Sequence, residues 1–62
     1  MWIARDKNCQ LYLFLRKPLK IESKGYWDYG HLLGRLPAGL FSNVKWTDEE
    51  PFEVDIIPKN YD

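Results

Sequence analysis

The sequence predicts a small all-β domain: an antiparallel meander or partly open barrel of four or five strands, with one short helical turn near residues 37–41. Three observations lead to this prediction. Two apolar, aromatic-rich runs near the start of the chain are separated by a turn-forming stretch. A run near the end alternates apolar and acidic residues. Between them, glycine and proline occur too densely for a long helix.

The length and composition limit the class of protein. The chain has 62 residues, of which 45% are hydrophobic and 16% aromatic. This length predicts a single domain over residues 1–62, with a thin core that buries only about 60% of the unfolded surface. The chain is too apolar for disorder, has no apolar run long enough for a membrane span, and has too few cysteines for a disulfide scaffold. A thin core favours a partner or self-association.

The first predicted element is a hairpin with arms at residues 2–5 and 11–15. Successive residues of a strand point to opposite faces. The three leucines of the second arm therefore face one side, and Tyr12 and Phe14 face the other. Either both apolar faces are covered, or one of them is a binding surface.

The middle of the chain predicts two further strands. Because Pro18 cannot donate to a strand ladder, residues 17–20 are expected to form a bend or an edge segment. Residues 26–29 form the third strand. Residues 31–36 form the next one, since their glycines argue against a helix.

After these strands, residues 37–41 are predicted as a single helical or 3₁₀ turn in which Leu40 and Phe41 close one end of the sheet. Residues 44–46 are a short strand or an extended link. The acidic stretch that follows imitates a helix cap, but Pro51 prevents a helix from propagating, so a loop is expected.

The last predicted strand covers residues 52–57 and alternates with period two. It is expected to be half exposed, because its outward residues are acidic. The alternation places Phe52, Val54 and Ile56 inward and Glu53 and Asp55 outward.

The net charge is zero, but the charges are segregated along the chain. Residues 1–24 hold six Lys or Arg and two Asp or Glu, whereas residues 48–62 hold six Asp or Glu and one Lys. The favoured interpretation is that the acidic end packs beside the basic half and the charges neutralise one another. The alternative is two separate faces of opposite sign, one of which meets a charged partner.

The start of the chain and its cysteine content predict a cytoplasmic protein. The chain opens with only four apolar residues before charged ones, so no secretory signal is recognised. The single cysteine, Cys9, cannot pair within the chain, which favours a reducing compartment.

Several short motifs at the two ends of the chain occur together. They are WIARDK, LYLF and KP at residues 2–7, 11–14 and 17–18, and LP, LF, VKW and DEEP at residues 36–37, 40–41, 44–46 and 48–51. The pattern resembles short uncharacterised proteins of gut-bacterial and phage-like genomes, and it covers both ends but not the middle third. Those proteins tend to have glycine in the first hairpin turn, near which Cys9 stands here. The resemblance implies a bacterial or phage setting and a compact fold, and it carries over no catalytic or binding residue.

The residues capable of catalysis do not form a recognisable motif. The lone His31 would have to serve as the base for a nucleophile, and no spacing places Cys9 or a hydroxyl residue beside it. The acidic run at residues 48–50 lacks the spacing of a calcium loop. The sequence therefore predicts no enzyme, no metal site and no cofactor.

The favoured function is a non-enzymatic protein-binding module, including possible homodimerisation. A small sheet with apolar faces leaves an edge or an aromatic face for a partner, and aromatic residues are enriched in binding hot spots. The expected binding residues are Tyr12, Phe14, Trp27 and Tyr29.

A second hypothesis is binding of single-stranded nucleic acid, which combines aromatic stacking with basic side chains. The basic residues expected to contact phosphate are Arg16, Lys17, Lys20 and Lys24. The acidic end of the chain opposes this hypothesis, because it would repel phosphate.

A third hypothesis is a phage-type inhibitor whose acidic segment imitates nucleic-acid phosphate and blocks a basic site on a host protein. The acidic surface in this case consists of Asp48, Glu49, Glu50, Glu53 and Asp55.

Overall fold

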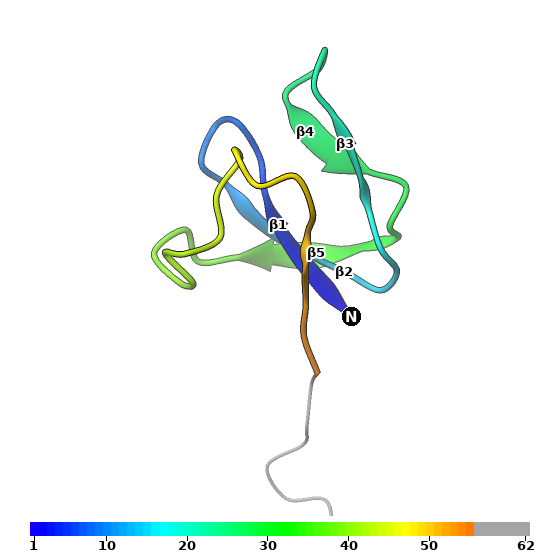
Figure 1. Cartoon of the computed structure of the whole chain (residues 1–62). Helices are drawn as coiled ribbons and strands as arrows, with labels where there is room; N and C mark the ends of the chain where they lie inside the picture. The colour runs from blue at the N-terminus through cyan, green and yellow to red at the C-terminus, as the bar shows by residue number, and fades with distance from the viewer. Residues whose placement is uncertain (56–62) are drawn as a thin grey trace, which may run out of the picture.

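Within residues 1–55, six short strands form two antiparallel sheets (Figure 1). A computed structural model of the chain describes residues 1–55. One sheet has four strands in the order β5-β2-β1-β6, namely β1 (Trp2–Arg5), β2 (Leu11–Phe14), β5 (Leu32–Leu36) and β6 (Phe52–Glu53). The other sheet pairs β3 (Leu19–Ile21) with β4 (Tyr26–Asp28). The predicted all-β class is confirmed, and the sheets do not close into a barrel.

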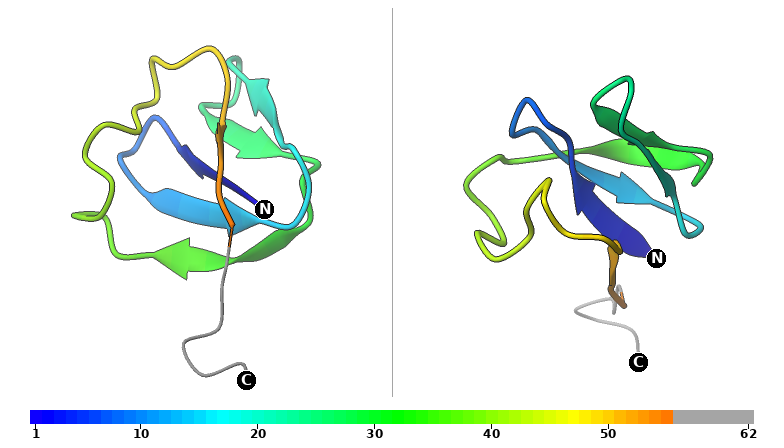
Figure 2. Two further views of the ribbon diagram at one scale, coloured as in Figure 1. Left: turned by 60° about the horizontal axis from the view of Figure 1, so that its bottom comes forward. Right: turned by 45° about the horizontal axis from the view of Figure 1, so that its top comes forward.

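The β3–β4 hairpin is an insertion between two strands that pair with each other. β5 lies beside β2 rather than beside β4, so the strands do not follow the order of a simple meander. Where the chain leaves and re-enters the large sheet, the N–H of Leu15 donates to the carbonyl of His31 at 3.0 Å, and that of Arg16 to Gly30 at 2.8 Å. These bonds prolong the β2–β5 ladder. The hairpin between them folds over one face of the large sheet (Figure 2).

The strand β3 is an addition to the sequence prediction, which expected only a bend or edge segment at residues 17–20. Pro18 is fully buried in the bend before β3. Because it precedes the first paired residue, Leu19, its missing N–H removes no hydrogen bond from the new ladder. The β3 backbone then pairs with β4 from Leu19 to Ile21. The expected hairpin of residues 2–5 and 11–15 is confirmed, with β2 ending at Phe14.

The link from β4 to β5 is tight and depends on Gly30. A β-carbon on this buried residue would lie 2.6 Å from the carbonyl oxygen of Arg16 and 2.9 Å from the β-carbon of Pro18. On either side of it, Tyr29 and His31 have φ angles of 65° and 59°, in the left-handed region. This link explains why β5 begins at residue 32 rather than at residue 31.

Each face of the large sheet carries its own core, as the two apolar faces predicted for β2 require. One core contains Ile3, Leu11 and Val44, with the half-buried Leu13, Leu36 and Val54 packed against it. The opposite core contains Ala4, Phe14 and Trp27, with the half-buried Trp2, Tyr12 and Trp46 packed against it. The chain after β5 covers the first face and the β3–β4 hairpin covers the second.

At residues 37–41, where a single helical or 3₁₀ turn was expected, the chain forms one turn closed by an i to i+3 hydrogen bond. The N–H of Leu40 donates to the carbonyl of Pro37 at 3.1 Å, and no helix forms anywhere in residues 1–55. Leu40 and Phe41 are exposed, so the prediction that they close one end of the sheet is wrong. Their carbonyls accept hydrogen bonds from the Arg5 guanidinium, which leaves the side chains on the outside of the turn.

Residues 44–46 form the link that was expected as an alternative to a strand, and the acidic stretch after them is a loop, as predicted. β6 then pairs with β1 at only two positions. Glu53 and Asp55 are exposed, as predicted. Phe52 is also exposed rather than inward, because β6 is the edge of the sheet and no described segment covers it. Ile56 and the rest of the predicted strand lie outside the described residues.

The structure contains no helix over residues 1–55 that is long and apolar enough to cross a membrane.

Candidate functional site

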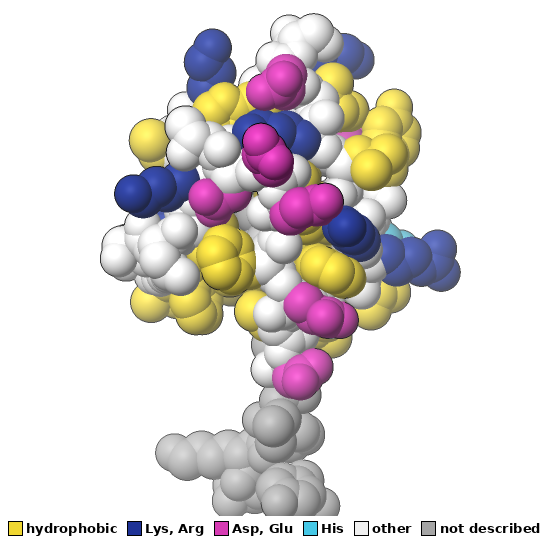
Figure 3. All heavy atoms as spheres, in the orientation of Figure 1, with side chains coloured by type: hydrophobic (Ala, Val, Ile, Leu, Met, Phe, Trp, Pro, Cys, Tyr) yellow, Lys and Arg dark blue, Asp and Glu magenta, His cyan; other side chains and the backbone are white. Residues whose placement is uncertain are grey.

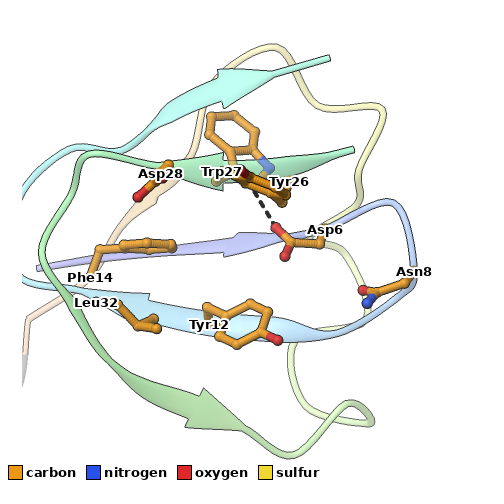
Figure 4. A pocket seen from close by; sticks show the side chains of 8 residues that line it. All are labelled: Asp6, Asn8, Tyr12, Phe14, Tyr26, Trp27, Asp28 and Leu32. Atoms are coloured by element: carbon orange, nitrogen blue, oxygen red, sulfur yellow. Dashed lines mark hydrogen bonds between the residues drawn. The ribbon is translucent and has the colours of Figure 1, made fainter. Parts of the chain in front are cut away.

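An open groove of about 390 Å³ lies between the two sheets (Figure 4). We call it the intersheet groove. Its walls come from the β1–β2 turn, β2, β4 and the start of β5, and the lining residues are Asp6, Asn8, Tyr12, Phe14, Tyr26, Trp27, Asp28 and Leu32.

Three of the four aromatic residues expected to bind a protein line this groove. Phe14 and Trp27 are only 3% and 6% exposed, so they form its floor and also belong to the core. Tyr12 is half-buried and presents part of its ring. Tyr29 is 73% exposed and is not among the lining residues.

The groove is held in shape by three consecutive residues at the end of β1. The carbonyl of Arg5 accepts a hydrogen bond from the indole Nε1–H of Trp27, and the Asp6 carboxylate accepts one from the Trp27 backbone N–H, both at 3.0 Å. The backbone N–H of Lys7 donates to the carbonyl of Gly25 at 3.0 Å. The distance between the sheets at the groove is therefore fixed by bonds that involve the backbone.

Two carboxylates give the groove its electrostatic character. Asp6 is only 9% exposed, and burial raises the pKa of its carboxyl above the ordinary value of 3.8, while the hydrogen bond from Trp27 partly opposes this shift. Asp28 is exposed and accepts a hydrogen bond from the N–H of Tyr29 at 2.7 Å. The lining contains no Lys or Arg. The intersheet groove is aromatic and acidic.

The sequence did not single out the other five lining residues for protein binding, namely Asp6, Asn8, Tyr26, Asp28 and Leu32. Asp6 carries the usual signal of a turn residue, and Tyr26 and Asp28 flank a tryptophan in a predicted strand. These signals are local, whereas the groove depends on which strand faces which turn. Only the position of the β3–β4 hairpin brings them together.

Two of the four basic residues expected to contact nucleic acid are occupied within the chain. The Lys17 ammonium lies 3.0 Å from a carboxylate oxygen of Glu50 and 5.7 Å from the ring centre of Trp2. The Lys20 ammonium is held between two tryptophans, as described next. Arg16 and Lys24 are exposed.

Lys20 occupies a small cation site inside the fold. Its ammonium lies 4.4 Å from the ring centre of Trp46 and 5.7 Å from that of Trp27, and it donates to the carbonyl of Asp48 at 3.0 Å. The two indole rings meet edge to face with centres 6.5 Å apart. Only 14% of the Lys20 side chain is exposed. These contacts connect the β3–β4 hairpin to the acidic loop.

The acidic residues of the segment at positions 48–55 are only partly available to a partner. The Asp48 carboxylate accepts a hydrogen bond from the N–H of Lys45 at 2.9 Å, and Glu50 pairs with Lys17. Glu49, Glu53 and Asp55 are exposed. Figure 3 shows Asp and Glu side chains following one another down this face with Lys or Arg side chains beside them. The contacts favour the interpretation in which acidic and basic segments neutralise each other.

The residues considered for catalysis do not meet. His31 and Cys9 are both exposed and lie outside the lining of the groove. Within residues 1–55, no three His, Cys, Asp or Glu side chains are grouped so as to hold a metal ion. The chemistry that the groove offers is the binding of a ligand by aromatic rings and carboxylates.

Comparisons of the chain with protein-family models, with curated proteins and with solved structures found no match.

Proposed function

We propose that this chain is a small non-enzymatic protein-binding module that receives a segment of its partner in the intersheet groove. The observation that carries the proposal is that Tyr12, Phe14 and Trp27 line one open depression between the sheets. Small-molecule sites in proteins are usually concave, with apolar and aromatic walls and a few polar groups, and the groove has this form. Aromatic residues also contribute most of the affinity at many interfaces.

Self-association is included in this proposal, because a second copy of the chain is one source of the partner segment. Among the strands of residues 1–55, β5 pairs with β2 on one side only, and its Leu32 and Leu33 are exposed. An edge strand with exposed apolar side chains is suited to pairing with another chain.

The two charge-based hypotheses have less support. Lys17, although exposed, pairs with Glu50, and Lys20 is mostly buried against two tryptophans, which leaves Arg16 and Lys24 as the exposed members of the basic set outside these contacts. The Glu50 carboxylate pairs with Lys17, and the Asp48 carboxylate accepts a hydrogen bond from the backbone N–H of Lys45. A nucleic-acid surface and a phosphate mimic would each have to use the remaining exposed residues.

We also propose a cytoplasmic location and a bacterial or phage setting. The single cysteine of the chain, Cys9, is exposed with a free thiol. A free exposed thiol is better suited to a reducing compartment than to an oxidising one.

The test is a selection from a random peptide library displayed on phage, with the chain immobilised, followed by titration of the selected peptides. Tyr12→Ala, which changes the groove, is compared with Tyr29→Ala, which removes an exposed tyrosine outside it. We expect the selected peptides to bind about tenfold more weakly to Tyr12→Ala and unchanged to Tyr29→Ala. Light scattering over a range of protein concentrations tests self-association in parallel.

A second matched pair guards against a folding defect in Tyr12→Ala. Leu32 and Leu33 are adjacent and both exposed, but only Leu32 lines the groove. Leu32→Ala is expected to weaken peptide binding and Leu33→Ala is not. Peptides that bind all four variants equally, or a chain that selects no peptide and stays monomeric, would refute the proposed function.

A further inference from the structure

The intersheet groove has an unusual combination of aromatic walls and a buried carboxylate. We infer that it binds a cationic side chain, lysine or arginine, presented by the partner segment. This inference rests on the proposed function and specifies the chemistry of the ligand.

The Asp6 carboxylate is buried beside the groove. Carboxylates are almost never buried without a pairing partner, because a charge is costly to remove from water. Among residues 1–55, the ion pairs are those of Lys17 with Glu50 and Lys20 with Glu22, so Asp6 has no cationic partner there. One of its oxygens accepts the Trp27 N–H, and Figure 4 shows the other turned toward the side of the groove where Tyr12 lies. A cation in the groove would supply the missing counter-charge.

The aromatic rings that line the groove also suit a cation. Cations are attracted to the faces of Trp, Tyr and Phe rings at separations of up to about 6 Å from the ring centre. The groove contains two tyrosines, Tyr12 and Tyr26, in addition to the floor made by Phe14 and Trp27. A long aliphatic stem can pack on these rings while its charged end reaches a carboxylate.

The fold already holds one cation against aromatic rings, namely the ammonium of Lys20. The Lys20 ammonium is placed between Trp27 and Trp46 and bonded to a carbonyl oxygen. The intersheet groove offers comparable rings with two carboxylates in place of the carbonyl. It is open and of about 390 Å³, which is sufficient for one long side chain.

The charges next to the groove do not fill it. Arg35 lies opposite Tyr12 in the β2–β5 ladder, but it lines a different depression with Pro37 and Ala38. Lys7 and Lys24 line a neighbouring depression with Asp6. Asp28 at the rim adds a second negative charge to that of Asp6. A cationic ligand therefore approaches a site whose own lining carries only negative charge.

The test is an NMR titration of the chain with three capped glycine-rich peptides that carry a central lysine, arginine or norleucine. Norleucine keeps the aliphatic stem of lysine and removes the charge. We expect the lysine and arginine peptides to shift the signals of the Trp27 backbone amide and its indole N–H, and the norleucine peptide to bind at least about tenfold more weakly.

Asp-to-Asn substitutions remove the charge of each carboxylate and keep the hydrogen bond that it accepts. Asp6→Asn keeps an oxygen that can accept the Trp27 N–H, and Asp28→Asn keeps one for the Tyr29 N–H. Asp6→Asn is expected to weaken the cationic peptides by about tenfold and Asp28→Asn by about threefold. Glu49→Gln removes an exposed carboxylate outside the groove and is the matched control. Arg35→Gln is expected to tighten binding about twofold, because it removes a neighbouring positive charge.

The inference fails if norleucine binds as well as lysine, if Asp6→Asn has no effect, or if no cationic peptide shifts the groove signals. The library selection separates this failure from that of the proposed function. If the binding of the selected peptides requires Tyr12 but the peptides contain no Lys or Arg, the proposed protein-binding function is supported. The inference that the ligand is cationic is then refuted.

Discussion

The Asp6 carboxylate accepts a hydrogen bond from the backbone N–H of Trp27 across 3.0 Å, and both residues are buried. This bond connects the turn that follows β1 to the central residue of β4. It therefore joins the two sheets, and it lies in the wall of the intersheet groove. The side chain that stabilises the contact between the sheets is therefore also part of the proposed binding site.

The first prediction concerns the hydrogen-bonding capacity of Asp6. Asp6→Ala leaves the buried Trp27 N–H without its acceptor and should lower the free energy of unfolding by about 1–3 kcal/mol. Asp6→Asn should lose much less stability, because its side-chain amide oxygen can still accept the hydrogen bond from the Trp27 N–H. Urea denaturation followed by tryptophan fluorescence measures both. Equal stability of the two variants would show that the bond is not important.

The second prediction is a pH dependence. Burial raises the pKa of the Asp6 carboxyl in the folded state above 3.8, so the folded chain holds this proton to higher pH than the unfolded chain does. The Asp6 contribution to the free energy of unfolding therefore falls as the pH rises from the pKa of the unfolded chain through the raised pKa of the folded chain. Asp6→Asn lacks this effect, so its stability relative to the wild type should increase as the pH rises above the ordinary pKa of 3.8. If the stability of Asp6→Asn relative to the wild type instead decreases as the pH rises, burial does not raise the pKa of Asp6.

The third prediction concerns Arg5, whose guanidinium donates hydrogen bonds to five backbone carbonyls. These belong to Cys9, Ala38, Leu40, Phe41 and Val44. Arg5→Met should cost about 1.5–3 kcal/mol, and Arg5→Lys should recover only part of this, because an ammonium cannot reproduce the fork of a guanidinium. Hydrogen exchange should become faster at Val44, whose N–H closes a turn with Phe41. The exposed Arg16→Met is the control, and an equal effect there would refute the role of Arg5.

The fourth prediction tests the cation site of Lys20. Lys20→Met keeps most of the stem and removes the charge between Trp27 and Trp46, together with the bond to the Asp48 carbonyl. The expected loss is about 1–2 kcal/mol in the free energy of unfolding. Lys24→Met, at an exposed position, should change stability by less than about 0.5 kcal/mol. Thermal and urea unfolding of the pair decide between a structural Lys20 and a dispensable one.

The fifth prediction concerns Cys9 in the β1–β2 turn. Its φ angle of 74° lies in the left-handed region, which is unfavourable for any residue with a β-carbon and free for glycine. Cys9→Gly should therefore raise the free energy of unfolding by about 0.5–1 kcal/mol. Cys9→Ser keeps the β-carbon and should give no gain, which separates the backbone effect from loss of the thiol. A gain in Cys9→Ser equal to that in Cys9→Gly would attribute the effect to the thiol.

The features that could be predicted from the sequence are those set by neighbours along the chain. The alternation in β2 predicted that Tyr12 and Phe14 would face away from the leucines, and the two cores confirm it. The first hairpin follows from two apolar runs around a short turn. Phe52 shows the limit of this reasoning, because alternation assigns a face but not whether another element covers that face.

The candidate site was predicted in part for the same reason. Tyr12, Phe14 and Trp27 could be chosen because aromatic residues are strongly enriched in binding sites. Nothing local distinguished the exposed Tyr29 from them. Asp6 and Arg5 were missed because a turn carboxylate and a strand arginine are ordinary in sequence, and their partners lie 21 and up to 39 residues away.

The sequence by itself determined the all-β class, the first hairpin and its two apolar faces, because strand alternation and turn residues act over a few positions. Only the tertiary structure decided that the β3–β4 hairpin folds back over β2, that Arg5 and Asp6 hold it there, and that Lys17 and Lys20 meet the acidic segment. The physical reason is that burial and long-range hydrogen bonding select among the ways in which short strands can pair. The same selection creates the intersheet groove.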